Sequence, residues 1–170
     1  MGKHEPFDRF LKRQERRYEA VLRSLETGMN VYGCPDWIFP RLRGLATGRK
    51  AFVFGILDGC SAKAYLQHPI LGDRLTTCCA AILNNKDKTP DEILGQGNAR
   101  KLHCCATLFA AVSREDSVFH QVLDQFFDGQ PDGATLGLLN GRILDLTYRK
   151  FLVAVDSAGG WEDHPKICIE

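Results

Sequence analysis

Apolar residues recur every three or four positions through most of this chain, which is the spacing of helices with one buried face. The first run spans residues 7–25 and predicts a single helix of about five turns, with Asp8 in its first turn and Gly28 at its end. The same spacing returns over residues 61–66, 69–82, 98–109, 113–127 and 132–139. The chain is therefore expected to be mainly helical.

Residues that favour helix starts support this division. Thr89-Pro90-Asp91-Glu92 has the pattern of a capping box, with proline at the first helical position. Asp132 opens the final run, which ends at Asn140-Gly141. The other helix starts are expected at Ser61, Pro69, Asn98 and Ser113.

Residues 28–50 lack any such period, because four glycines and two prolines interrupt them. Trp37, Ile38 and Phe39 make this segment too apolar to lie free in solvent, so it is expected to cross a core or line a pocket. Residues 143–155 are apolar again, with a spacing that suits either a last helix or a strand. We predict an all-α fold: a single compact multi-helix domain with an irregular aromatic segment and a variable C-terminal tail.

The composition is that of an ordinary globular protein, with 44% hydrophobic and 25% charged residues. The formal net charge of +1 provides no overall field for recruiting nucleic acid or an anionic membrane. The chain opens without an apolar leader, and no run approaches the roughly 20 apolar residues of a membrane-spanning helix. We therefore expect a cytoplasmic protein with neither a membrane nor a nucleic-acid partner.

One face of the first predicted helix is nonetheless basic. Its cations are Arg9, Lys12, Arg13, Arg16 and Arg17, against the acids Glu15 and Glu19. The simplest interpretation is a solvated surface with salt bridges. The alternative is nucleic-acid binding through this helix, which would depend steeply on salt concentration.

The seven cysteines are an odd number in a chain without a secretory signal, so free thiols are expected rather than a disulfide framework. No Cys-x-x-Cys motif is present. Cys78-Cys79 and Cys104-Cys105 are adjacent pairs, and neighbours on a helix diverge by about 100°. Neither pair is therefore expected to converge on one metal ion, and we predict no metal and no cofactor.

Several short motifs follow one another as they do in a known family. They are Phe7-Asp8-Arg9-Phe10, Ile38-Phe39-Pro40, Ala64-Tyr65-Leu66, His68-Pro69 and Thr107-Leu108-Phe109. In this order they resemble the domain of unknown function 1810 family, whose members are sometimes mislabelled calpastatin. The resemblance covers residues 7–139 and implies one mainly helical domain, with residues 140–170 as a C-terminal extension. It implies no reaction, because the activity of the family is unassigned.

The chain departs from the family pattern at polar positions. Gly33-Cys34-Pro35-Asp36 stands where the family has His-Trp-Met-Trp, and Arg41 and Ser61 replace a Gln and a Glu. Cys104-Cys105-Ala106 replaces Ser-Ser-Met. The resemblance implies that these positions line a pocket whose apolar frame is kept. Either the activity has been lost or the pocket has been refitted for another ligand, and we favour refitting.

Cations cluster after this altered segment. Arg41, Arg43, Arg49 and Lys50 fall within ten residues, with no acid between Trp37 and Leu57. Arginine binds carboxylate or phosphate with two parallel hydrogen bonds, so Arg41 and Arg43 are candidates for holding an anion. The alternative is a solvated loop. Trp37 and Tyr65 could form the walls of such a pocket, or they could be core residues.

Thiols and carboxylates provide the candidates for chemistry. A nucleophilic cysteine needs a nearby cation, histidine or helix N-terminus, which the arginines or His103 could supply. Asp36 is the preferred acid–base residue because it stands in the altered segment, and Asp58 is another. The alternatives are inert buried thiols and turn-forming aspartates. The candidate thiols are Cys34, Cys60, Cys104 and Cys105, with His68 and His120 as more distant partners.

These features predict a cofactor-free enzyme that acts on a small anionic metabolite in a specialised pathway. The competing prediction is a non-catalytic module that binds a ligand or a protein on the same scaffold. The predicted catalytic residues are Asp36, Cys34 and Cys104. The predicted substrate-binding residues are Trp37, Arg41, Arg43, Tyr65 and His103.

Overall fold

A computed structural model describes residues 7–141 of the chain. Within this range the backbone forms nine helices and one isolated β-bridge, so the all-α prediction is confirmed. The helices are α1 (Asp8–Glu15), α2 (Tyr18–Glu26), α3 (Arg49–Val53), α4 (Gly59–Gln67), α5 (Leu71–Leu83), α6 (Pro90–Leu94), α7 (Ala99–Ala110), α8 (Val118–Phe127) and α9 (Gly133–Leu139).

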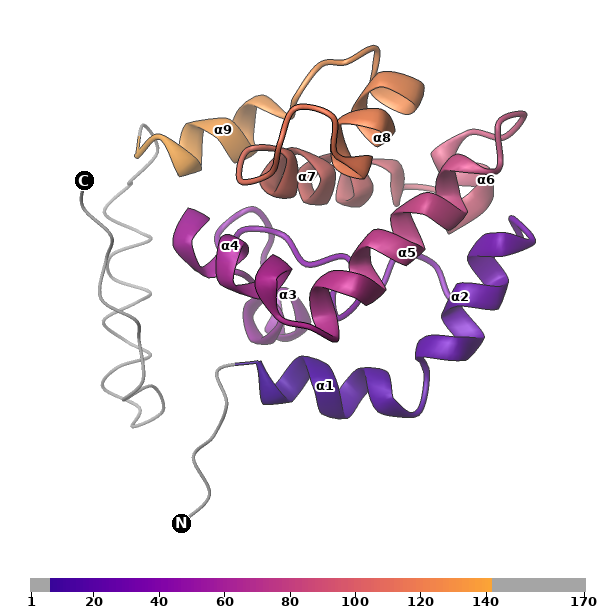
Figure 1. Cartoon of the computed structure of the whole chain (residues 1–170), viewed down its shortest axis with the longest axis horizontal. Helices are drawn as coiled ribbons and strands as arrows, with labels where there is room; N and C mark the ends of the chain where they lie inside the picture. Colours follow the sequence, from indigo (N-terminus) through magenta and orange to yellow (C-terminus); the bar gives the residue numbers. More distant parts are fainter. Residues whose placement is uncertain (1–6, 142–170) are drawn as a thin grey trace.

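The core lies around α5 and α7. Helix α5 crosses the middle of the molecule, with α7, α8 and α9 above it and α1 below it (Figure 1). It packs against α2, α4 and α8, while α7 packs against α4, α6, α8 and α9. Both helices bury most of their side chains, including the thiols of Cys78, Cys79, Cys104 and Cys105.

The prediction of one helix over residues 7–25 is wrong, because the chain turns at Arg16-Arg17 and forms two helices. Gln14, a polar residue next to this corner, faces inward and is 1% exposed. Its Nε2 donates to the carbonyl oxygen of Trp37 at 2.7 Å, and its Oε1 accepts from Arg74 at 3.2 Å. Each helix can therefore pack its apolar face on a different part of the core.

The segment between α2 and α3 is irregular, as predicted, and its aromatic residues are buried. Ile38 and Phe39 are almost fully enclosed. The segment then pairs with the chain after α3 through a parallel bridge between Leu42 and Ile56. The short helix α3 was not expected, because five residues are too few to show a helical period.

The helix starts are partly as predicted. The capping box of Thr89 and Glu92 is present, and Asp132 caps α9 by accepting the backbone N–H of Thr135 at 2.8 Å. The expected start at Ser61 is wrong, because Asp58 caps α4 and Ser61 donates its backbone N–H to that carboxylate. Of the other expected starts, Asn98 is the N-cap of α7 and Pro69 lies one residue before Ile70, the N-cap of α5. The expected start at Ser113 is wrong, because the N-cap of α8 is Ser117.

Two further sequence predictions concern membrane-spanning helices and the C-terminal part of the chain. No helix within residues 7–141 is both long and apolar enough to cross a membrane. The apolar run over 143–155 lies outside the described residues, as does most of the extension over 140–170.

Candidate functional site

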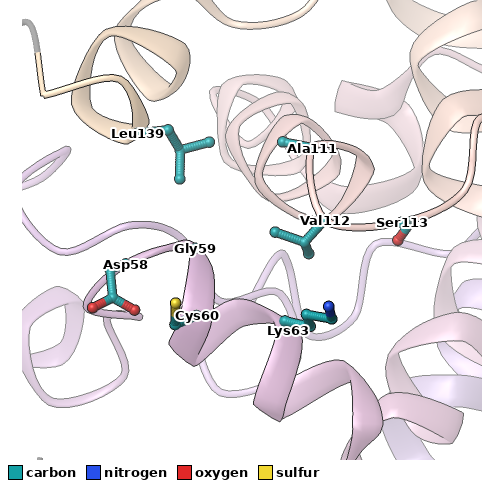
Figure 2. Close-up of a pocket in the computed structure, with 8 residues that line it drawn as sticks. All are labelled: Asp58, Gly59, Cys60, Lys63, Ala111, Val112, Ser113 and Leu139. Atoms are coloured by element: carbon teal, nitrogen blue, oxygen red, sulfur yellow. The ribbon is translucent and has the colours of Figure 1, made fainter. Parts of the chain in front are cut away.

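A pocket of about 610 Å³ opens between the start of α4, the end of α7 and the end of α9. The residues that line it come from three segments far apart in the sequence (Figure 2). They are Asp58, Gly59, Cys60, Lys63, Ala111, Val112, Ser113 and Leu139.

Backbone hydrogen bonds and a helix cap position the residues on the α4 side of this pocket. The backbone N–H of Ile56 donates to the carbonyl of Arg41, and the N–H of Arg43 donates to the carbonyl of Ile56, both at 2.8 Å. This pairing fixes the chain two residues before Asp58, which then caps α4 at 2.7 Å from the Ser61 nitrogen. The cap aligns the first turn of the helix, where Cys60 lies.

Gly59 leaves room for the pocket because it has no side chain. A Cβ atom there would lie 3.7 Å from Leu139 and 3.9 Å from Val112, which is ordinary van der Waals contact. A larger side chain at this position would project into the space that those two residues border. The volume of the pocket therefore depends on a small residue at position 59.

The polar residues of the pocket are arranged along α4. Figure 2 shows Cys60 between Asp58 and Lys63, with its sulfur pointing into the space bordered by Leu139 and Val112 and with Lys63 directed toward Ser113. Cys60 is half-buried and lies in the first turn of α4. Ser113 Oγ donates to the carbonyl of Phe109 at 2.6 Å, so it faces a ligand as an acceptor.

The structure brings four of the predicted site residues together elsewhere, in what we call the inner cluster: Cys34, Asp36, Arg41 and Cys104. Arg41 donates two hydrogen bonds to Oδ1 of Asp36, at 2.8 Å from Nη2 and 3.2 Å from Nε. The two side chains are only 12% and 13% exposed. The carboxylate predicted as an acid or base and the guanidinium predicted to hold an anion are therefore paired with each other.

Burial disfavours ionisation of the two cysteines of the inner cluster. It raises the pKa of Cys34 to about 12, against the partial effect of the Lys101 ammonium. The pKa of Cys104 is also raised, first by burial and then by the neighbouring Asp132 carboxylate. Both groups are therefore neutral thiols near pH 7, which is unsuited to the nucleophilic role predicted for them.

Asp132 joins the inner cluster to α9. Burial alone would raise its pKa, but hydrogen bonds from Thr135 and from the Cys104 thiol outweigh burial and lower it. The Thr135 hydroxyl lies 2.7 Å from the Asp132 carboxylate, and the Asp132 N–H donates to Thr107 at 2.8 Å. Cys104 therefore contacts a carboxylate that caps a helix.

Two of the remaining predicted binding residues, Tyr65 and Trp37, are buried in the core. Tyr65 is fully buried among the rings of Phe7, Phe10 and Phe109, as the core interpretation expected. Trp37 is 9% exposed.

Arg43 and His103 also hold parts of the fold together. The Arg43 guanidinium lies 4.5 Å from the centroid of the Phe52 ring, and Arg43 is 5% exposed. His103 stacks on Phe127 at 4.1 Å, with Nε2 2.7 Å from the carbonyl oxygen of Gln130.

Sequence reasoning named Cys60 and Asp58 as candidates but missed Lys63 and Ser113. The spacing of Cys60 and Lys63, three residues apart on one helix, was the available signal, since such residues are neighbours on a helix surface. Ser113 gave no signal, because it reaches the pocket only through the packing of α7 on α4.

The six described cysteines are free thiols, as expected, and Cys168 lies outside the described residues. No group of three or more His, Cys, Asp or Glu residues within 7–141 is placed to hold a metal ion.

Comparison with known proteins identifies a family and a fold. A family profile described as a protein of unknown function (DUF1810) matches residues 4–139. The crystal structure of the conserved hypothetical protein Rv1873 from Mycobacterium tuberculosis is similar, with a TM-score of 0.76. The two sequences are 33% identical over 80% of this chain and 99% of that one. No curated protein matches the chain.

Proposed function

We propose that this chain, which belongs to the DUF1810 family, binds a small anionic molecule in the pocket between α4, α7 and α9. One observation carries the proposal: an accessible thiol, an amine and an apolar surface line the same cavity. Ligand sites in proteins are typically apolar clefts with a few polar groups that orient the ligand. The inner cluster supports the proposal less well, because its charges are paired and its thiols are buried.

The pocket favours one orientation of the ligand. Lys63 provides a cation at one end, so we place the anionic group of the ligand there. Asp58 provides a carboxylate at the other end, which favours a hydrogen-bond donor on the ligand and repels a second anionic group. Ala111, Val112 and Leu139 would cover an apolar body between the two ends.

Cys60 takes the catalytic role in this proposal in place of Cys34 and Cys104. Its sulfur reaches the pocket, whereas the thiols of Cys34 and Cys104 are buried. A cofactor-free reaction, a specialised pathway and a cytoplasmic location stay predictions.

Binding can be tested by a thermal-shift screen of the full chain against carboxylate- and phosphate-bearing metabolites. A ligand at 100 times its Kd is expected to stabilise the protein by about 2.7 kcal/mol. Gly59→Val would project into the pocket beside Leu139 and Val112 and should abolish the shift, while Lys63→Gln would reduce it. Lys86→Gln removes the same charge from an exposed site away from the pocket and is the matched control. A shift that survives Gly59→Val would contradict the proposed site.

The choice between an enzyme and a binding module can be tested with Cys60→Ser. For an enzyme that uses the thiol, this variant keeps ligand affinity within a factor of a few and loses turnover. For a binding module, there is no turnover to lose, and the variant keeps the ligand affinity of the wild type. If the pocket binds a protein instead of a small ligand, no metabolite in the screen should stabilise the chain. Gly59→Val should then weaken binding of that protein.

A further inference from the structure

Helix α9, the last described helix, leaves its leucines only partly covered. Thr135 is its buried residue, whereas Leu136, Leu138 and Leu139 are all half-buried. Leu139 borders the pocket together with Val112, which is also half-buried (Figure 2). Covering this surface with another apolar group would be favourable, because it removes apolar area from water.

Helix α9 ends directly beside this surface. Gly141 donates its backbone N–H to the carbonyl of Leu138 at 3.1 Å and has a φ of +69°, the left-handed conformation that typically ends a helix. The chain therefore leaves the axis of α9 two residues after Leu139, which lines the pocket.

The residues that follow are close enough to cross the pocket. A Cβ atom at Gly59 would lie 3.7 Å from Leu139, and Lys63 is four residues farther along α4, a rise of about 6 Å. The six residues from Leu139 to Asp145 can span up to about 20 Å. Asp145 can therefore reach Lys63 at the far end of the pocket.

The sequence after Gly141 matches the pocket in chemistry and in order. It reads Arg142-Ile143-Leu144-Asp145, a cation, two apolar residues and an anion. The pocket has the Asp58 carboxylate at one end, an apolar surface between, and the Lys63 ammonium at the other end. Within residues 7–141 no ion pair engages either of these two charges. A segment that enters beside Leu139 would place opposite charges together at both ends.

This segment is additional to the domain that the family shares. The family profile ends at residue 139, next to the pocket. Rv1873 is matched over 99% of its length by 80% of this chain, so the remaining fifth has no counterpart there. The extension therefore adds residues 142–145 next to a pocket that belongs to the shared domain.

We propose that residues 142–145 fold back into the pocket of their own chain, with Ile143 and Leu144 on its apolar surface and Asp145 at Lys63. The segment has the chemistry of the ligand proposed above, an apolar body with an anionic end, and competes with it for the pocket. Docking needs no ligand, but the role as a competitor rests on the proposed function.

Disulfide trapping in the full chain tests the docked position. Leu144→Cys, with Cys168→Ser to remove the other thiol of the extension, should form a disulfide with the native Cys60 when the protein is oxidised with diamide. Peptide mapping without reduction identifies the bond. Adding Ile143→Ser keeps the tether and the new thiol but removes an apolar contact, so it should slow trapping about tenfold.

Two results of this experiment would overturn the proposal. Equal trapping with and without Ile143→Ser would show random encounter of two thiols on one chain. A disulfide between two chains would assign the pocket to the segment of a second copy.

The rate of Cys60 alkylation in the full chain is a second measurement. Docked and undocked states exchange, so Cys60 is protected in part and still reacts before the core thiols. Ile143→Ser/Leu144→Ser changes no charge and should raise the rate about threefold or more, because the undocked fraction increases. Leu152→Ser/Val153→Ser makes a similar change farther along the extension and should leave the rate unchanged. Equal rates in all three proteins would overturn the proposal.

Failure of this proposal and failure of the proposed function give different results. Trapping at Cys60 with no metabolite that stabilises the chain would support docking and contradict the ligand. A metabolite that binds the wild type and Ile143→Ser/Leu144→Ser with the same Kd would support the ligand and overturn docking. If both hold, that variant should bind the metabolite about threefold or more tightly, because no competitor has to be displaced.

Discussion

The inner cluster and the pocket each hold a cysteine near a cation: Cys34 near Arg41 in one, Cys60 near Lys63 in the other. In the inner cluster the cation is paired with Asp36 and the thiol is enclosed. In the pocket the thiol is half-buried and the lysine is exposed. The difference shows that residue type and proximity do not make a reactive site without access for a ligand. Substitutions in the inner cluster should therefore change stability, and those in the pocket should change binding.

The largest stability effect is expected from breaking the ion pair of the inner cluster. Asp36→Asn leaves the Arg41 charge in a poorly hydrated place and should destabilise the fold by about 2 kcal/mol, between the values for exposed and buried pairs. Urea denaturation measures the change. The double variant Asp36→Asn/Arg41→Gln should recover part of the loss, because no uncompensated charge remains. Equal stability of Asp36→Asn and the wild type would mean that the pair is effectively solvated.

A smaller loss of stability is expected from replacing a buried cysteine, and almost none from replacing the cysteine of the pocket. Cys105→Ser places a hydroxyl in a fully buried site and should cost about 1.5 kcal/mol, whereas Cys60→Ser should stay within about 0.5 kcal/mol of the wild type. Thermal unfolding of the two variants gives both values. A loss in Cys60→Ser as large as that in Cys105→Ser would remove the distinction between pocket and core.

The smallest of these effects concerns the cap that joins the inner cluster to α9. Asp132→Ala should destabilise the fold by about 1 kcal/mol through loss of the N-cap, whereas Asp132→Asn keeps a capping oxygen.

The lowered pKa of Asp132 also predicts that the stability of the fold depends on pH. Because the pKa of Asp132 is lowered in the fold, its carboxylate contributes stability above its ordinary pKa of 3.8 and loses it as the pH falls through the folded value. The wild type should therefore lose more stability than Asp132→Asn on acidification below about pH 4. Urea midpoints at a series of pH values measure this, and parallel pH profiles would contradict it.

Much of the helical architecture could be predicted from local signals. The capping box at Thr89 and the cap at Asp132 are each contained within four residues, and both are present. The break in the first helix could not be foreseen, because Gln14 is polar and reads as a surface residue until its partners Trp37 and Arg74 are known. Those partners lie 23 and 60 residues away.

The site was less predictable than the fold for the same reason. Cys34 and Cys104 were predicted to be catalytic and Cys60 was only a candidate thiol, because burial of a thiol depends on the packing of distant segments. Nothing near Cys60 in the sequence indicates that Ser113 and Leu139 complete a pocket around it. The departures from the family pattern did locate one real cluster, in which Asp36 and Arg41 form an ion pair.

The measurement that tests the central claim most directly is the rate at which each thiol is alkylated in the native protein, followed by peptide mapping. A pKa of about 12 for Cys34, against 9.0 for an ordinary thiol, lowers its thiolate fraction by about 10³. Cys60 is half-buried and reaches the pocket, so it should react first. Cys34 should react more slowly than an ordinary exposed thiol by about that factor, and Cys104 should also be slower because burial raises its pKa. Alkylation of Cys34 or Cys104 as fast as Cys60 would contradict the account and return the site to the inner cluster.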